Sequence, residues 1–332
     1  MTPANHLPRI VLLGTGGTIA ATAHTTTQLT DYTVTEGVHS LLEAVPGLRK
    51  LAHIQSQQVF NIDSRAMSSA MLLKLAQHIN EVLTRDDVDA VVITHGTDTL
   101  EETACFLHWT IKSSKPVILT AAMRPASAYS ADGSMNLYHA MLTACHPQSV
   151  GQGVLVVLND QIHSARFLTK QHTSRVDAFA SPDAGPLGQI ANGQLRFLVH
   201  SVLPHTTQSE FDVRLQHELP RVLILFDHPD ACPEAMRNAA QNGVSGFIIA
   251  ATGNGSITPG SQQGIEIVSR MGVRCVRASR IGVGSVSTSS HDEALGLIAA
   301  QWLPAIKARI LLQLALTHTN EPQALRQIFN RY

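Results

Sequence analysis

The chain has 332 residues, of which 44% are hydrophobic and 15% are charged, and its 24 lysines and arginines nearly balance its 25 aspartates and glutamates. This length favours two domains, and the composition is that of an ordinary globular protein. No apolar stretch approaches the ~20 residues of a membrane span, and no basic cluster could follow a phosphate backbone. We therefore expect neither a membrane nor a nucleic acid as partner.

The first half of the chain alternates short apolar runs with amphipathic stretches. Strands are predicted over residues 9–14, 89–94, 116–121 and 153–158, and helices over residues 68–84, 99–112 and 134–145. Such alternation predicts a parallel sheet with crossover helices.

The polar segment 199–219 interrupts this alternation and is predicted to be a linker. Beyond it, strands are predicted over residues 221–226, 245–250 and 273–277, helices over residues 233–242 and 261–271, and helical structure from about Asp292 onward. We therefore expect an α/β protein with a large N-terminal domain (1–198) and a smaller C-terminal α/β domain (220–332). The large domain should have a mixed, mostly parallel sheet flanked by helices, and the small domain a parallel sheet.

Two hydroxyl-rich turns follow strands of the predicted large sheet. GTGGTIA (14–20) follows the first strand, and THGTD (94–98) follows a later one. Ligands of such sheets bind beyond the carboxyl ends of the strands, so both turns should face one crevice. GTGGTIA fits neither a P-loop nor the dinucleotide fingerprint, which needs a small residue where Ile19 stands. Its glycines explain a tight turn but leave Thr15 and Thr18 unexplained.

The stretch VVITHGTDTLEETA (91–104) combines a strand end with a helix start. Thr99 and Glu102 are predicted to form a capping box, and His95 is predicted to be a packing residue at the strand end. These structural roles leave Thr97 and Asp98 unexplained. Both lie at a helix N-terminus, which favours developing negative charge.

A threonine hydroxyl needs a base or a polarising neighbour before it can act as a nucleophile. The candidates are Tyr32, in a hydroxyl-rich loop, and Lys170, in a segment that follows the strand ending at Leu158. The Lys170 segment can therefore reach the same edge of the sheet.

Metal-binding patterns are missing from the sequence. Its 17 histidines lack ligand spacing, and its four cysteines lack CxxC pairing. We expect no metal and no cofactor, and we interpret Cys105, Cys145, Cys232 and Cys275 as buried free thiols.

Four segments follow one another in the chain: GTGGTIA, HGTDTLEETA, AAMRPASAYSADGSMNL (121–137) and the Lys170 segment. In this order they resemble the bacterial L-asparaginases, close to their tetrameric type II branch and the glutaminase-asparaginases. The similarity covers essentially the whole chain. It implies hydrolysis of L-asparagine to L-aspartate and ammonia through a threonine acyl-enzyme, with L-glutaminase side activity. The alternatives are a dedicated glutaminase-asparaginase, a nucleotide-binding oxidoreductase and a non-catalytic amino-acid-binding module.

The resemblance also implies catalytic roles. Thr18 would be the nucleophile, Tyr32 would polarise it, and Lys170 with Asp98 would help Thr97 act as a base. The backbone N–H groups of Thr97 and Ala122 would bind the oxyanion.

For substrate binding, the resemblance assigns Ser64 to the α-carboxylate, with Arg65 beside it, and Asp98 to the ammonium group. Asn254 would come from the neighbouring subunit of a homotetramer, built as a dimer of intimate dimers, so the C-terminal domain would complete a neighbour's active site.

The sequence departs from the family pattern at three places. Arg65 stands where a glutamine is common. Near Ser289 and Ser290 a glutamate that discriminates against glutamine is missing, and Asp292 or Glu293 would replace it only if the alignment slips. The disulfide of periplasmic relatives is also missing, and since the N-terminus shows no signal-peptide pattern, we expect a cytoplasmic protein.

Overall fold

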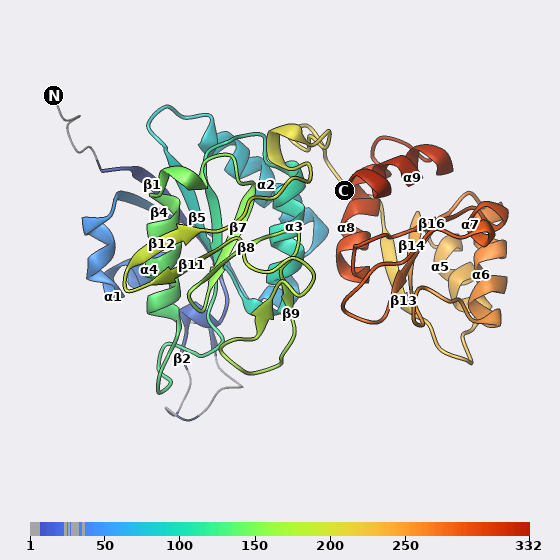
Figure 1. The fold of residues 1–332 in the computed structure, drawn as a ribbon, viewed down its shortest axis with the longest axis horizontal. Coiled ribbons are helices and arrows are strands. Elements are labelled where there is room, and N and C mark those ends of the chain that lie inside the picture. The colour runs from blue at the N-terminus through green and yellow to red at the C-terminus, as the bar shows by residue number, and fades with distance from the viewer. Residues whose placement is uncertain (1–6, 23–24, 26, 28–32, 35–36) are drawn as a thin grey trace. The chain divides into compact units, whose positions relative to one another are not determined.

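The computed structural model describes residues 7–332 except 23–24, 26, 28–32 and 35–36 (Figure 1). The chain divides into two compact units, Met1–Leu215 and Gln216–Tyr332. Each unit has its own sheet and hydrophobic core. Within the segment interpreted as a linker, Phe211 and Val213 are buried, and the irregular chain up to Leu215 belongs to the first unit.

An eight-stranded sheet organises the first unit, in the order β12-β11-β8-β7-β6-β5-β1-β4. Its strands are β1 (Arg9–Gly16), β4 (His53–Ile62), β5 (Ala90–Thr94), β6 (Val117–Thr120), β7 (Val154–Leu158), β8 (Gln161–Ser164), β11 (Gly188–Ala191) and β12 (Gln194–Phe197). Neighbours from β4 to β7 pair in parallel, whereas β8, β11 and β12 extend the sheet by antiparallel hairpin pairing. The predicted mixed, mostly parallel sheet is therefore confirmed.

The chain leaves β1 for β4 on one side and then crosses to β5 on the other side. This order makes β1 and β5 the topological switch point, where open α/β sheets bind ligands beyond their carboxyl ends. Two small ribbons accompany the sheet, formed by β2 (Ala21–Thr22) with β3 (Thr33–Val34) and by β9 (Thr169–Lys170) with β10 (Phe179–Ala180).

Four helices cover the two faces of this sheet (Figure 1). They are α1 (Val38–Ala44), α2 (Ser69–Leu83), α3 (Leu100–Thr110) and α4 (Gly133–Ala144). Residues of α1 and α4 share one core with Ile10, Leu12 and Val92, whose side chains point to that face because strand side chains alternate. Ser68 caps the N-terminus of α2, and its hydroxyl accepts a hydrogen bond from the Met71 N–H. Short 3-10 helices occur at Pro46–Lys50, Pro147–Ser149 and Thr206–Gln208.

The second unit contains a parallel four-stranded sheet, as predicted, in the order β13-β14-β15-β16. Its elements are β13 (Val222–Phe226), α5 (Pro233–Gln241), β14 (Gly246–Ala251), α6 (Pro259–Arg270), β15 (Arg274–Ser279), α7 (Ser290–Leu295), β16 (Leu297–Ala299), α8 (Ala305–Ala315) and α9 (Pro322–Arg331). Met236, Ile265 and Val268 of α5 and α6 pack with Phe247 of β14 in one core. The strand β16 corrects our expectation of continuous helical structure after Asp292.

All four cysteines are free thiols. Cys105 and Cys275 are buried and Cys145 is half-buried, but the prediction of a buried thiol is wrong for Cys232, which is exposed. Cys232 precedes α5, and its Sγ lies 3.2 Å from Glu234 Oε2. In the part of the chain that the structure describes, no helix has the length and apolar character needed to cross a membrane.

Candidate active site

The turn after β1 is held against β5 by a buried hydroxyl. Thr15 is 2% exposed, and its Oγ1 donates a hydrogen bond to Thr94 O at 2.9 Å. This contact gives Thr15 a structural role. Thr18 begins a 3-10 helix, Thr18–Ala20, and is buried.

Glycines bring the two hydroxyl-rich turns into contact. Gly17 has a φ of 87°, and a Cβ placed on it would lie 2.3 Å from Gly96 Cα. A Cβ on Gly96 would lie 2.7 Å from Ser64 Oγ. Because no side chain fits between these backbones, Thr18, Thr97 and Ser64 lie on three closely packed loops at the switch point.

Thr97, Asp98 and Lys170 form one cluster, although Lys170 is 72 residues from Asp98 in the chain. Lys170 Nζ donates hydrogen bonds to Thr97 Oγ1 at 3.0 Å and to Asp98 Oδ1 at 2.6 Å. The lysine side chain is 16% exposed, whereas that of Asp98 is 52% exposed. The ammonium group is thus withdrawn from water, and the carboxylate keeps a face toward solvent.

Glu101, which the sequence had suggested only as part of a helix start, contacts this cluster. It is buried, and its Oε1 accepts a hydrogen bond from the Lys170 backbone N–H at 3.4 Å. Its Oε2 is buried without a hydrogen-bond partner among the described residues. The pattern LEETA gave no sign of this, because it fits an ordinary first turn of a helix.

The predicted capping box is wrong. Thr99 does precede α3, but its side chain caps nothing and its Oγ1 donates a hydrogen bond to Ser64 O at 2.8 Å. The residues Thr97–Thr99 form a separate 3-10 turn before the helix, so the local pattern was overridden by a contact with a distant loop.

His95 is a buried packing residue, as predicted. Its Nδ1 lies 2.7 Å from Gly96 O, and its Nε2 lies 3.0 Å from Thr103 Oγ1. Burial lowers the pKa of His95 from an ordinary value of 6.5 to about 4, against the opposing effect of the Gly96 hydrogen bond. The imidazole is therefore neutral near pH 7.

Arg65 is engaged with its neighbour Asp63. The guanidinium donates from Nε to Asp63 Oδ1 at 3.0 Å and from Nη2 to Asp63 Oδ2 at 2.8 Å. The Arg65 hydrogen bond lowers the pKa of the Asp63 carboxyl below its usual range, although burial opposes this.

The turn that carries Ala122 is fixed by α4. Asp132 accepts hydrogen bonds from the Met123 N–H at 3.0 Å and the Arg124 N–H at 2.9 Å. Asn136 donates to Ala121 O at 3.0 Å. The Ala122 backbone is held from both sides, and the sequence gave no sign that Asp132 and Asn136 do this.

Asn254 lies in the second unit, where it is exposed on the loop after β14. Tyr32 lies outside the described residues. Among the residues with a described placement, no group of three or more His, Cys, Asp or Glu side chains could hold a metal ion.

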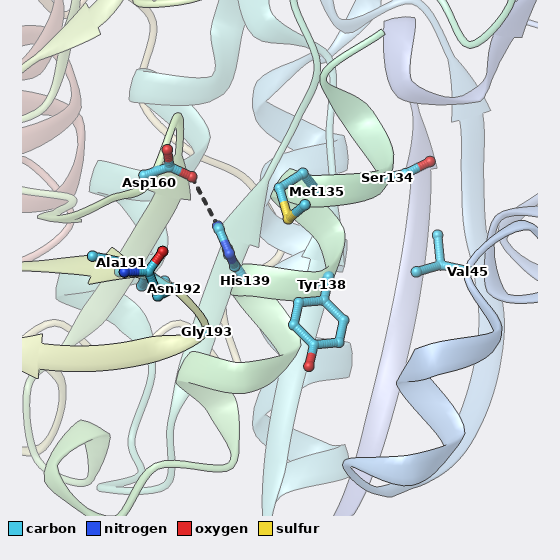
Figure 2. A pocket seen from close by; sticks show the side chains of 10 residues that line it. Val45, Ser134, Met135, Tyr138, His139, Asp160, Ala191, Asn192 and Gly193 are labelled. Atoms are coloured by element: carbon cyan, nitrogen blue, oxygen red, sulfur yellow. Dashed lines mark ion pairs between the residues drawn. The ribbon is translucent and has the colours of Figure 1, made fainter. Parts of the chain in front are cut away.

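A separate groove of about 760 Å³ lies beside α4 in the first unit (Figure 2). The described residues that line it include Val45, Met135, Tyr138 and His139, whose Nδ1 faces Asp160 Oδ1 at 3.1 Å. None of the predicted site residues is among them, so this groove is distinct from the threonine cluster.

Comparison with known proteins assigns both units. The family model of the asparaginase N-terminal domain matches residues 9–203, and that of the glutaminase/asparaginase C-terminal domain matches residues 221–329. The chain is 42% identical over 327 residues to L-asparaginase 2 of Bacillus subtilis, which covers 98% of this chain and 87% of that protein. It is 36% identical over 330 residues to the glutaminase-asparaginase of Pseudomonas fluorescens, with 98% and 91% covered. A solved structure, a probable cytoplasmic L-asparaginase from Campylobacter jejuni, superposes with a TM-score of 0.96 at 42% identity over 98% of this chain and 100% of the other.

Proposed function

The chain belongs to the asparaginase family of amide hydrolases, and from this membership and its threonine cluster we propose that it hydrolyses L-asparagine to L-aspartate and ammonia, with L-glutaminase activity beside it. The observation that carries the mechanism is the position of Lys170 Nζ, 3.0 Å from Thr97 Oγ1 and 2.6 Å from Asp98 Oδ1. A lysine held this way can relay a proton from a threonine hydroxyl.

In the proposed reaction, Thr18 Oγ1 attacks the side-chain amide carbon, and the C–N bond breaks as ammonia leaves with a proton. Water then hydrolyses the acyl-enzyme. In each step Thr97 takes the proton of the attacking hydroxyl or water and passes its own proton to Lys170 in its neutral amine form, which returns it to the leaving nitrogen or, in the second step, to the Thr18 oxygen. Amides resist attack, so the oxyanion needs donors, and we assign this role to the Ala122 and Thr97 N–H groups. One such donor is typically worth about 2.7–4 kcal/mol.

For substrate binding, we propose that Asp98 accepts the ammonium group and Ser64 the α-carboxylate. The half-exposed carboxylate of Asp98 supports this role, because a face remains toward solvent while Oδ1 binds Lys170. Arg65 would assist at the carboxylate after leaving Asp63, and Tyr32 would polarise Thr18.

Ammonia release from purified protein with L-asparagine tests the activity. Thr18→Ala and Thr97→Val should each abolish turnover with the fold intact. Thr15→Val is the matched control, since Thr15 lies in the same turn as Thr18 and its hydroxyl donates to Thr94 O on β5. It should cost about 1 kcal/mol of unfolding free energy but preserve turnover. Normal turnover in Thr18→Ala or Thr97→Val would refute the mechanism.

A dedicated glutaminase-asparaginase is the second candidate, favoured by the role of Asp292. This side chain is buried and paired with Arg277, so it is not placed to replace the missing discriminating glutamate. We expect relaxed discrimination. An asparagine preference beyond roughly 10³-fold in kcat/KM would contradict it.

We also propose a homotetramer in which Asn254 completes a neighbour's active site. Mixing inactive Thr18→Ala subunits with Asn254→Ala subunits should restore one intact site in each mixed pair. Ammonia release that stays at the level of the separate variants, after subunit exchange is verified, would count against shared sites.

We propose that the protein is cytoplasmic. The exposed free thiol of Cys232 supports this proposal, because free thiols persist in a reducing compartment. The relatives differ, since the Haemophilus influenzae relative is named a probable periplasmic L-asparaginase. Fractionation of the source cells against marker enzymes of both compartments tests this proposal.

A further inference from the structure

A buried arginine organises the loops around Asn254. Arg277, on β15, is 5% exposed, and it pairs with Asp292, which is 1% exposed. Its Nε donates to Asp292 Oδ1 at 2.6 Å and its Nη2 to Asp292 Oδ2 at 2.8 Å. This bidentate geometry fixes both side chains, because a planar fork of donors matches the two carboxylate oxygens.

The same guanidinium also binds the loop that carries Asn254. Its Nη1 donates to Asn254 O at 3.1 Å and to Gly255 O at 3.3 Å, and its Nη2 donates to Ser287 O. One buried cation therefore joins the loop after β14, the loop before α7 and the first turn of α7.

The side chain of Asn254 is in turn fixed by Ser287. The Ser287 N–H donates to Asn254 Oδ1 at 2.9 Å, and Asn254 Nδ2 lies 3.4 Å from Ser287 Oγ. Arg277 binds the backbone carbonyls of both Asn254 and Ser287, so it fixes the position of each residue in this contact. Asn254 itself is exposed at the edge of a hollow that Arg277, Ser287 and Asp292 also line.

Asp292 uses both carboxylate oxygens within this cluster. In addition to Arg277, it accepts a hydrogen bond from the Ser289 N–H at 2.7 Å. Burial acts to raise the pKa of Asp292, but the hydrogen bonds from Arg277 and Ser289 outweigh it and the pKa is lowered. Both oxygens of the Asp292 carboxylate are therefore bound by Arg277 and the Ser289 N–H.

We infer that Arg277 and Asp292 are positioning residues that hold Asn254 in the conformation in which it binds substrate. The inference rests on the proposed function, in which Asn254 contacts the substrate of a neighbouring subunit. Neither Arg277 nor Asp292 touches substrate. Their effect is to remove in advance the conformational freedom that the Asn254 loop would otherwise lose on binding.

Loss of this positioning should weaken substrate binding more than it slows the chemical step. Arg277→Lys keeps the charge but loses the fork, so the Asn254 loop gains freedom. We expect the KM for L-asparagine to rise about tenfold, the effect of losing about one net hydrogen bond, while kcat changes little.

The experiment is a double-mutant cycle of Arg277→Lys with Asn254→Ala, measured by steady-state kinetics on the full-length protein. If Arg277 acts through Asn254, it should have no further effect on KM once Asn254 is alanine. Arg274→Lys is the matched control, because Arg274 lies on the same strand but donates to Asn320 O instead; its KM should stay at the wild-type value.

Thermal unfolding of each variant checks the fold, and Ser287→Ala, at an exposed position, gives a milder loosening if Arg277→Lys does not fold. A wild-type KM in both Arg277→Lys and Ser287→Ala, or fully additive effects with Asn254→Ala, would overturn the inference. Failure of the proposed function gives a different result, since wild-type protein would then release no ammonia from L-asparagine. A wild-type KM in Asn254→Ala would refute the role of Asn254 and with it the inference, while the threonine mechanism would stand.

Discussion

Replacement of Lys170 by methionine separates chemistry from stability in this fold. Methionine keeps most of the length and apolar surface of the lysine but removes the ammonium group that lies between Thr97 and Asp98. The matched control is Lys112→Met, since Lys112 Nζ also makes two hydrogen bonds, to Thr206 O at 3.3 Å and to Ser209 O at 2.6 Å.

The two substitutions should have opposite effects. Loss of positioned proton transfer at Lys170 should reduce kcat by about 10²–10⁴-fold. Its cost in stability should stay within about 1 kcal/mol, because the partner Asp98 is 52% exposed and becomes solvated. Lys112→Met removes a charged donor from two backbone carbonyls and should cost about 1.5–3 kcal/mol, with kcat preserved.

Urea unfolding and steady-state ammonia release on both variants test the contrast. Lys170→Met with kcat within tenfold of wild type would refute the proposed proton relay. A stability loss in Lys170→Met as large as in Lys112→Met would instead show that Lys170 serves mainly to hold the loops together.

Three further changes probe the surroundings of the site. Gly17→Ala places a Cβ 2.3 Å from Gly96 Cα at a φ of 87°. The free energy of unfolding in urea should fall by at least about 1–3 kcal/mol, and ammonia release should fall with it. Values near those of the wild type would contradict the close contact. Asp132→Asn leaves one acceptor for the two N–H groups beside Ala122, so kcat should fall about 10- to 100-fold with KM nearly unchanged. An unchanged kcat would show that Asp132 does not hold the Ala122 backbone in place for the reaction. Because the pKa of His95 is lowered to about 4, the unfolded state binds a proton at higher pH than the folded state does. The free energy of unfolding should therefore fall by up to about 3 kcal/mol as pH drops from about 6.5 to about 4. His95→Gln should flatten this pH dependence in urea titrations, and an unchanged slope would show that His95 is not its source.

The sequence by itself determined most of the strands and helices and the two turns that we propose carry the chemistry. The mostly apolar run of β5 and the alternation of strands with amphipathic helices predicted the parallel sheet. Thr18 and Thr97 could be proposed as site residues because each follows a strand end, a relation between residues that are close in the chain. His95 was correctly interpreted as a packing residue for the same reason.

Only the tertiary structure decided which polar side chains meet. Thr99 binds the distant Ser64 carbonyl instead of capping its own helix, and Glu101 contacts Lys170 from a helix turn that looked ordinary. Asp292 is paired with Arg277, 15 residues away in the chain. Periodicity and capping patterns depend on neighbours within one turn or strand, whereas a buried polar group must take whichever partner the folded chain places within hydrogen-bond distance.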